Sequence, residues 1–196
     1  MPRIKLCGLR RLVDIDYANQ VQPDLVGVVF APESFRAVTG DQAQRLRQRL
    51  DAKIPMVGVF TTTPLARIMT LVQAGIIQQV QLHGPINDDR VTALQAAKIP
   101  VMQAVTPVNA TQSQANTVLL DNVNPGSGQP LAWSAIARPK RPFFLAGGLT
   151  PDNVTNAIQV LQPAGVDVSS GIETAGVKDF KKIQAFMRSV RNVNNN

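Results

Sequence analysis

The chain has 196 residues, of which 44% are hydrophobic and 17% charged, a composition typical of a globular protein with one sizeable core. No run approaches the roughly 18 consecutive apolar residues of a membrane span, and the first residues lack the features of a signal peptide. The net charge of +7 favours an anionic partner, but aromatic residues make up only 5%, so we expect a solvated basic surface and neither a nucleic acid nor a membrane partner.

Eight short apolar runs of β-forming residues recur along the chain, about one per 24.5 residues if 196 residues are divided by eight. They are Ile4–Cys7, Leu25–Phe30, Met56–Phe60, Val80–Leu82, Val101–Val105, Val118–Asp121, Phe143–Ala146 and Val166–Ser169. Each interval is too long for a hairpin connection and has the length of a strand followed by a helix. The repeat therefore predicts alternating strands and helices.

Helical periodicity appears in several intervals between these runs. Apolar faces are formed by Ala43, Leu46 and Leu50, by Val154, Ala157, Ile158 and Leu161, and by Phe180, Ile183, Met187 and Val190. Thr150 followed by Pro151 predicts a helix start. The interval Thr106–Thr117 has no apolar stripe, so the fifth helix should be short or irregular. The densest basic groups, Arg45–Arg49 and Lys178–Lys182, are expected on outer helix faces.

Alternating strands and helices imply parallel pairing with right-handed crossovers. Eight such units predict the α/β class and a single (β/α)8 TIM barrel over residues 1–191, followed by a polar tail at 192–196. An open doubly wound sheet is the alternative. In a barrel, function belongs at the C-terminal strand ends, which here are Cys7, Phe30 with its loop to Arg36, Phe60, His83, Val105, Asp121, Gly147–Gly148 and Ser169–Gly171.

Small residues follow the last two predicted strands. Gly147 and Gly148 come after the seventh, and Ser169, Ser170 and Gly171 after the eighth. Glycine lets the backbone approach a ligand closely, and the loops after strands 7 and 8 are the usual phosphate site of this fold. Ordinary tight turns are the alternative, but two such loops at adjacent strand ends favour phosphate.

Cys7 is the only cysteine, which excludes an internal disulfide and fits a reducing, cytoplasmic location. A lone cysteine is more often a small buried apolar residue than a reactive one. A functional thiol needs a cationic neighbour and partial exposure, and Lys5 lies on the same face of the strand. Composition alone leaves both interpretations open.

Asp121, Arg36 and His83 accompany Cys7 at the strand ends or in the loops after them, and Asp167 lies inside the eighth predicted strand. Asp121 either caps a loop or stays protonated beside a thiolate and donates a proton. Asp167 either binds a hydroxyl or pairs with a lysine. Arg36 can bind a carboxylate bidentately or lie in solvent. His83, the only histidine, has no companion ligands, so no metal site is predicted, and the nucleotide-binding glycine motifs are absent.

An ordered set of motifs covers nearly the whole chain. It comprises K-L-C-G-L at Lys5–Leu9, V-G-V-V-F with S-F-R at Val26–Arg36, V-G-V-F at Val57–Phe60, V-Q-L-H-G at Val80–Gly84, L-L-D at Leu119–Asp121, G-S-G at Gly126–Gly128, L-A-G-G-L-T-P-D-N-V at Leu145–Val154 and G-V-D-V-S-S-G-I-E at Gly165–Glu173. In these motifs the chain resembles the phosphoribosylanthranilate isomerases of tryptophan biosynthesis. Any one motif is weak, but the ordered set is specific.

The resemblance implies an Amadori rearrangement of N-(5-phosphoribosyl)anthranilate to 1-(2-carboxyphenylamino)-1-deoxyribulose 5-phosphate, with no cofactor or metal, by a monomer or homodimer. It implies Asp121 as general acid, Cys7 as general base and Arg36 as the ligand of the anthranilate carboxylate. Phosphate would bind at Gly147, Gly148, Ser169, Ser170 and Gly171, and a ribose hydroxyl at Asp167.

The chain departs from the family pattern at Phe35, Pro85 and Ala132, which alters loop shape but no proposed catalytic group. Another phosphate-binding barrel, such as indole-glycerol-phosphate synthase, is an alternative. That family uses lysine and glutamate at the mouth of the barrel, where this chain has Cys7 and Asp121. A polyanion-binding module is a further alternative. It predicts steeply salt-dependent nucleic-acid binding that does not depend on Cys7.

Overall fold

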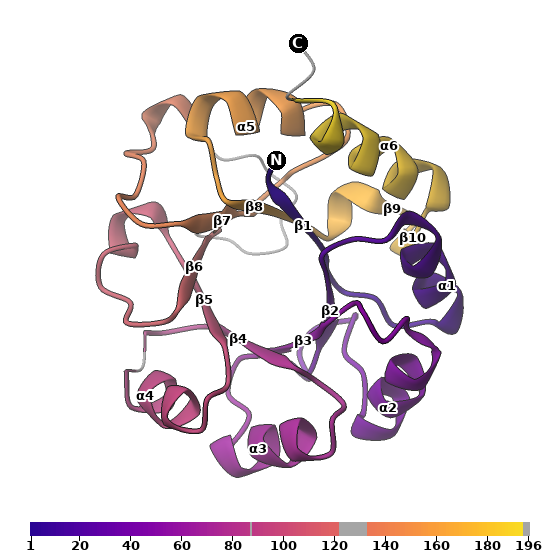
Figure 1. The fold of residues 1–196 in the computed structure, drawn as a ribbon, viewed down its shortest axis with the longest axis vertical. Helices are drawn as coiled ribbons and strands as arrows, with labels where there is room; N and C mark the ends of the chain where they lie inside the picture. The colour runs from indigo at the N-terminus through magenta and orange to yellow at the C-terminus, as the bar shows by residue number, and fades with distance from the viewer. Residues whose placement is uncertain (87, 122–132, 194–196) are drawn as a thin grey trace.

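Eight parallel strands close into a barrel in the computed structural model, which describes residues 1–86, 88–121 and 133–193. The strands are β1 (Arg3–Leu6), β2 (Leu25–Val29), β3 (Met56–Phe60), β4 (Gln79–His83), β5 (Val101–Val105), β6 (Thr117–Leu120), β7 (Phe143–Leu145) and β8 (Gly165–Val168). Each pairs with the next, and β8 pairs with β1, which closes the ring seen in Figure 1. The barrel prediction is confirmed, and no predicted strand end is more than one residue from the observed one.

Helices cover the outside of the ring (Figure 1). They are α1 (Leu12–Val21), α2 (Gly40–Arg49), α3 (Leu65–Gln73), α4 (Asp88–Ala96), α5 (Val154–Leu161) and α6 (Phe180–Arg191). The connection after β5 contains only the 3-10 turn η1 (Pro107–Asn109), so the short fifth helix is confirmed. The described part of the connection after β6 holds a second such turn, η2 (Trp133–Ala135), which the sequence pattern did not predict. None of the helices in the described ranges is long and apolar enough to cross a membrane.

The predicted helix faces are largely confirmed, but two details are wrong. The buried face of α6 includes Phe186, whereas Phe180 is half-buried and stacks on Tyr17 with ring centroids 4.9 Å apart. Helix α5 begins at Val154 rather than at the Thr150–Pro151 pair. The Asn153 side chain accepts a hydrogen bond from the Thr150 amide at 2.8 Å, and this local bond holds the preceding residues in a turn.

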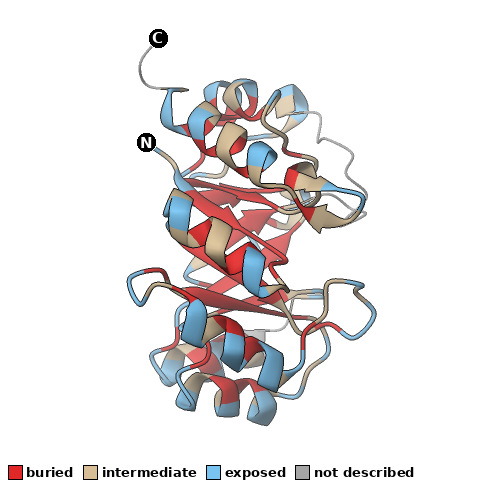
Figure 2. Ribbon diagram, turned by 90° about the vertical axis from the view of Figure 1, so that its right-hand side faces the viewer, coloured by how far each residue is buried: buried red, intermediate tan, exposed pale blue. Residues whose placement is uncertain are grey.

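The barrel has two apolar layers. One lies between strands and helices, and the strands that separate the layers are mostly buried (Figure 2). The inner layer fills the ring with Leu25, Val57, Met102, Ala104, Leu119, Phe144 and Ala146. Lys5 and Asp167 share this interior, because Lys5 pairs in register with Leu25 on one side and with Asp167 on the other. The inside of the barrel therefore contains charge as well as apolar side chains.

Candidate active site

The residues predicted to form the site lie where the strands end, at one end of the barrel. Cys7 follows β1, Arg36 lies in the loop after β2, Asp121 follows β6, Gly147 and Gly148 follow β7, and Ser169 to Gly171 follow β8. A Cβ added at Gly8 would lie 2.6 Å from Arg36 Cδ and 3.0 Å from Ser169 Oγ. The segments after β1, β2 and β8 therefore meet at one point.

Cys7 is buried among charged groups. Its neighbour on the same face of β1, Lys5, is fully buried and donates from Nζ to Asp167 Oδ1 at 2.9 Å. A Cβ added at Gly27 on β2 would lie 2.7 Å from Cys7 Sγ and 2.9 Å from Lys5 Nζ, so glycine at this position makes room for both side chains. Burial raises the pKa of the Cys7 thiol, and the ammonium of Lys5 opposes that rise.

Asp167 pairs with a lysine, which is one of the two roles predicted for it. Its Oδ1 atom forms the ion pair with Lys5, and the residue is 8% exposed. Within the described part of the chain, Oδ2 of Asp167 has no hydrogen-bond partner and is therefore available to a ligand at the barrel mouth.

Asp121 lies next to His83. His83 Nε2 is 3.7 Å from Asp121 Oδ2, and both side chains are largely buried. His83 ends β4 and Asp121 follows β6, which are not neighbouring strands, so this contact passes over β5 at the barrel mouth. Sequence analysis placed both residues at the mouth but did not predict their contact. No group of three or more His, Cys, Asp or Glu side chains suited to a metal occurs among the residues described.

Arg36 is held by Glu173, a residue that the sequence analysis quoted in a motif but gave no role. Arg36 Nε donates to Glu173 Oε1 at 2.8 Å, and Nη2 donates to Oε2 at 2.6 Å. The guanidinium also stacks on Phe35, with Cζ 4.1 Å from the ring centroid. The solvated alternative for Arg36 is wrong, because only 12% of its side chain is exposed.

Lys178 joins the same network. It lies in β10 (Val177–Lys178), which pairs with β9 (Glu173–Thr174) in a two-stranded sheet after β8, and not on an outer helix face as predicted. Its Nζ bonds to Glu173 Oε1 at 2.7 Å and to the Ser169 carbonyl at 3.0 Å. Burial lowers the pKa of Lys178, against the opposing effect of Glu173. The local pattern of basic residues did not reveal this fold-back.

The loops after β7 and β8 lie against each other. Gly147 and Gly148 have φ angles of 83° and 66°, a region that favours glycine. A Cβ added at Gly171 would lie 1.8 Å from the carbonyl oxygen of Leu149, so only glycine allows this close approach. The ammonium of Lys178 lies beside these loops, where it donates to the carbonyl of Ser169.

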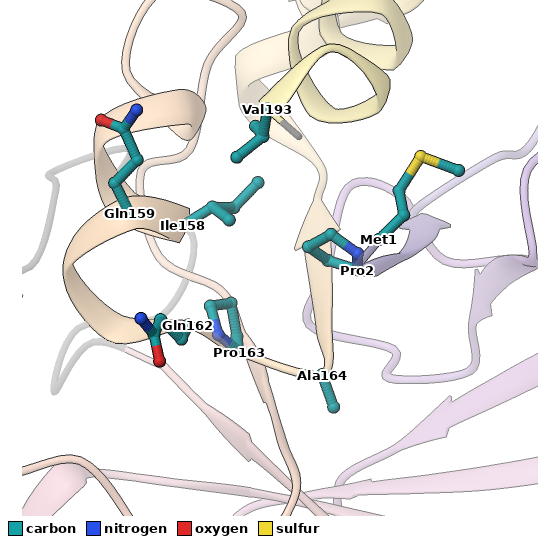
Figure 3. Close-up of a pocket in the computed structure, with 8 residues that line it drawn as sticks. All are labelled: Met1, Pro2, Ile158, Gln159, Gln162, Pro163, Ala164 and Val193. Atoms are coloured by element: carbon teal, nitrogen blue, oxygen red, sulfur yellow. The ribbon is translucent and has the colours of Figure 1, made fainter. Parts of the chain in front are cut away.

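A cavity of about 570 Å³ lies at the opposite end of the barrel (Figure 3). Met1 and Pro2 precede β1 there, and Pro163 and Ala164 precede β8. The lining residues have no ionisable side chain. The N-terminal face of such barrels serves stability rather than catalysis, so the strand-end cluster is the candidate site.

The chain is similar to known proteins over nearly its whole length. The sequence model of the family described as "N-(5'phosphoribosyl)anthranilate (PRA) isomerase" matches residues 4–189. The chain is 53% identical over 190 residues to N-(5'-phosphoribosyl)anthranilate isomerase of Lactiplantibacillus plantarum, covering 96% of this chain and 91% of that protein.

Two solved structures share the fold over nearly their whole length. A phosphoribosyl anthranilate isomerase in complex with reduced 1-(o-carboxyphenylamino)-1-deoxyribulose 5-phosphate is 31% identical, with a TM-score of 0.85 and coverage of 98% of this chain and 100% of that one. A structure of "mutually generated monomers" of the dimeric enzyme from Thermotoga maritima is 32% identical, with a TM-score of 0.86 and coverage of 98% and 100%. The chain belongs to the N-(5'-phosphoribosyl)anthranilate isomerase family.

Proposed function

We propose that this chain isomerises N-(5-phosphoribosyl)anthranilate to 1-(2-carboxyphenylamino)-1-deoxyribulose 5-phosphate in tryptophan biosynthesis, with Cys7 as general base and Asp121 as general acid. The observation that carries the residue assignment is their placement: both follow strands at the C-terminal end of the barrel, on β1 and β6. A base and an acid separated by β7 and β8 can act on two parts of one bound sugar.

The reaction needs two proton transfers. Asp121 in its protonated form donates to the furanose ring oxygen, the C1–O bond breaks, and the ring opens to a Schiff base with the anthranilate nitrogen. The Cys7 thiolate then removes the proton from C2, and the electron pair moves to give the enolamine. Tautomerisation of the enolamine yields the ketone, and no atom is gained or lost overall.

The two anionic groups of the substrate would bind at two different parts of the mouth. Arg36 would bind the anthranilate carboxylate through Nη1, because Nε and Nη2 are held by Glu173. Gly147, Gly148, Ser169, Ser170 and Gly171 would bind the phosphate, next to Lys178. Asp167 would accept from a ribose hydroxyl through Oδ2 while Oδ1 keeps its bond to Lys5.

The relative from Thermotoga maritima is described as dimeric, and we propose that this chain acts as a homodimer or a monomer. We also propose a cytoplasmic location, which suits an unpaired cysteine that must stay reduced.

The test uses phosphoribosylanthranilate made in situ, with its consumption followed for wild type, Cys7→Ser and Asp121→Asn. Loss of general acid or base catalysis should reduce kcat by about 10²- to 10⁴-fold in each variant. Near-wild-type turnover by both variants would show that the acid–base assignment is wrong. Circular dichroism of each variant separates a catalytic effect from unfolding.

A further inference from the structure

Lys5 is a buried lysine that the proton transfers proposed above do not use. Its side chain is fully buried inside the barrel, and Nζ donates to Asp167 Oδ1 at 2.9 Å. Burial disfavours the ammonium form, but Asp167 and Cys7 together raise the pKa of Lys5 above its ordinary value. Lys5 therefore carries its positive charge at neutral pH, inside the barrel and beneath the proposed base.

The geometry directs this charge at Cys7. Residues two apart on a strand share a face, so Lys5 and Cys7 both point into the barrel. A single Cβ added at Gly27 would lie 2.7 Å from Cys7 Sγ and 2.9 Å from Lys5 Nζ, so both side-chain ends converge above that glycine. Asp167 fixes the ammonium from the other side, on β8.

The charges around Cys7 have an uneven balance. The charged side chains that act on its sulfur are Lys5, Asp167 and Lys178. Lys178 forms an ion pair with Glu173, which also pairs with Arg36. These are three cations and two carboxylates, so the cluster has one excess positive charge while Cys7 is a thiol. A thiolate would neutralise that excess. Burial of the sulfur acts in the opposite direction, and Lys5 exerts the largest opposing influence.

We infer that Lys5 is a positioning residue that allows Cys7 to ionise inside the barrel, with Asp167 holding the Lys5 ammonium in place. The inference rests on the proposed base role of Cys7. Lys5 neither forms nor breaks a bond in the reaction. It stabilises the negative charge on sulfur, before the thiolate takes up the C2 proton.

The test compares two variants that differ only at Lys5. Lys5→Met alone would leave Asp167 as an unpaired buried carboxylate and is prone to unfold. The matched pair is therefore Asp167→Asn and Lys5→Met/Asp167→Asn, with Lys5→Gln/Asp167→Asn as a second double variant whose amides can bond to each other. Because Cys7 is the only cysteine, uptake of iodoacetamide as a function of pH reports on that thiol alone.

Loss of the ammonium should move the midpoint of alkylation to higher pH. We expect both double variants to have a midpoint at least about one pH unit above that of Asp167→Asn, since a close opposite charge shifts a pKa by about 1–3 units. At pH 7 their kcat should be at most about one tenth of that of Asp167→Asn, because fewer molecules carry the thiolate. Their KM should lie within about threefold of that of Asp167→Asn, because Lys5 does not contact the substrate. A purely structural role for Lys5 would not move the alkylation midpoint.

The two proposals fail separately. Equal alkylation midpoints in the folded Asp167→Asn protein and a folded double variant would overturn the role of Lys5, whatever the activity. Full activity of Cys7→Ser would instead overturn the base role of Cys7. Circular dichroism identifies which double variants are folded and can be compared.

Discussion

Arg36 and Glu173 form a bidentate ion pair across 137 positions of the chain, with Nε and Nη2 of the guanidinium each bonded to one carboxylate oxygen. Lys178 bonds to the same carboxylate at 2.7 Å. Glu173 therefore fixes the orientation of the guanidinium before any substrate arrives. It also balances two cations that would otherwise repel each other in a largely buried position.

Glu173→Gln should weaken substrate binding more than it slows the chemical steps. The amide cannot accept from Arg36 as a carboxylate does, so the guanidinium loses its fixed orientation, and KM should rise about tenfold, a binding difference of about 1.4 kcal/mol. The matched control is Asp16→Asn. It removes an exposed ion pair with a similar nitrogen–oxygen distance, 2.7 Å from Arg49 Nε to Asp16 Oδ1. Exposed pairs contribute little, so the control should be near wild type in KM and stability. Equal KM values for both variants would contradict the role given to Glu173.

Arg36→Ala should raise KM by about 10- to 100-fold, the equivalent of one or two charge-assisted hydrogen bonds to the anthranilate carboxylate. Its kcat should change much less, since Arg36 takes no part in proton transfer. Arg36→Lys keeps the charge but not the planar guanidinium, so its KM should lie between those of wild type and Arg36→Ala. Steady-state kinetics of the three proteins check this order. An unchanged KM for Arg36→Ala would show that Arg36 does not bind the anthranilate carboxylate.

Acid should remove the stabilising effect of Glu173. Burial opposes its charge, but hydrogen bonds from Arg36 and Lys178 outweigh burial and lower the pKa of Glu173 below its ordinary 4.5. Because the folded pKa is the lower one, the contribution is present above pH 4.5 and is lost as pH falls through the folded value. The difference in Tm between wild type and Glu173→Gln should therefore be constant near neutrality and shrink in acid. A gap that widens as pH falls below 4.5 would contradict the ion pair.

Gly27→Ala should damage the site directly. The new methyl group would meet Cys7 Sγ at 2.7 Å, Lys5 Nζ at 2.9 Å and Cys7 Cα at 3.2 Å, so it must displace the proposed base or the strand that carries it. Overpacking of this kind costs about 1–3 kcal/mol, and kcat should fall about tenfold or more.

Gly40→Ala is the matched control for that substitution. Its methyl group would meet only flexible side chains, the Arg67 guanidinium at 2.8 Å foremost, near the start of α2. Alanine also favours a helix more than glycine does, so the control should keep both its activity and its thermal stability. Wild-type kcat in Gly27→Ala would show that the crowding around Cys7 is absent.

Local patterns predicted the strands well because each strand is an apolar run between polar, glycine or proline-containing segments, and eight strand–helix units match the repeat of a closed barrel. The helix start at Thr150 was wrong because the side chain of Asn153 competes for the backbone of that turn. Pairing with a lysine was one of two alternatives for Asp167, and the register between β1 and β8 places Lys5 beside it.

Other parts of the site depend on contacts that no local pattern records. Glu173 and Lys178 lie in a short hairpin that returns toward Arg36. In the sequence, a glutamate and a lysine five residues apart look no different from charged residues on an exposed loop. The contact between His83 and Asp121 joins strands that are not neighbours. The motif at Gly126–Gly128 and the departure at Ala132 lie outside the described residues, as do positions 194–196 of the predicted tail.

The pairing of Lys5 with Asp167 has a consequence for how the protein is made. The two residues are 162 positions apart, on the first and last strands of the barrel. A nascent chain presents Lys5 and Cys7 well before Asp167 and Lys178, the other charged groups that act on Cys7, have been synthesised. The thiol therefore acquires its charged surroundings only when β8 and the hairpin that follows it dock onto β1. The charged surroundings of the thiol therefore depend on closure of the ring between β8 and β1.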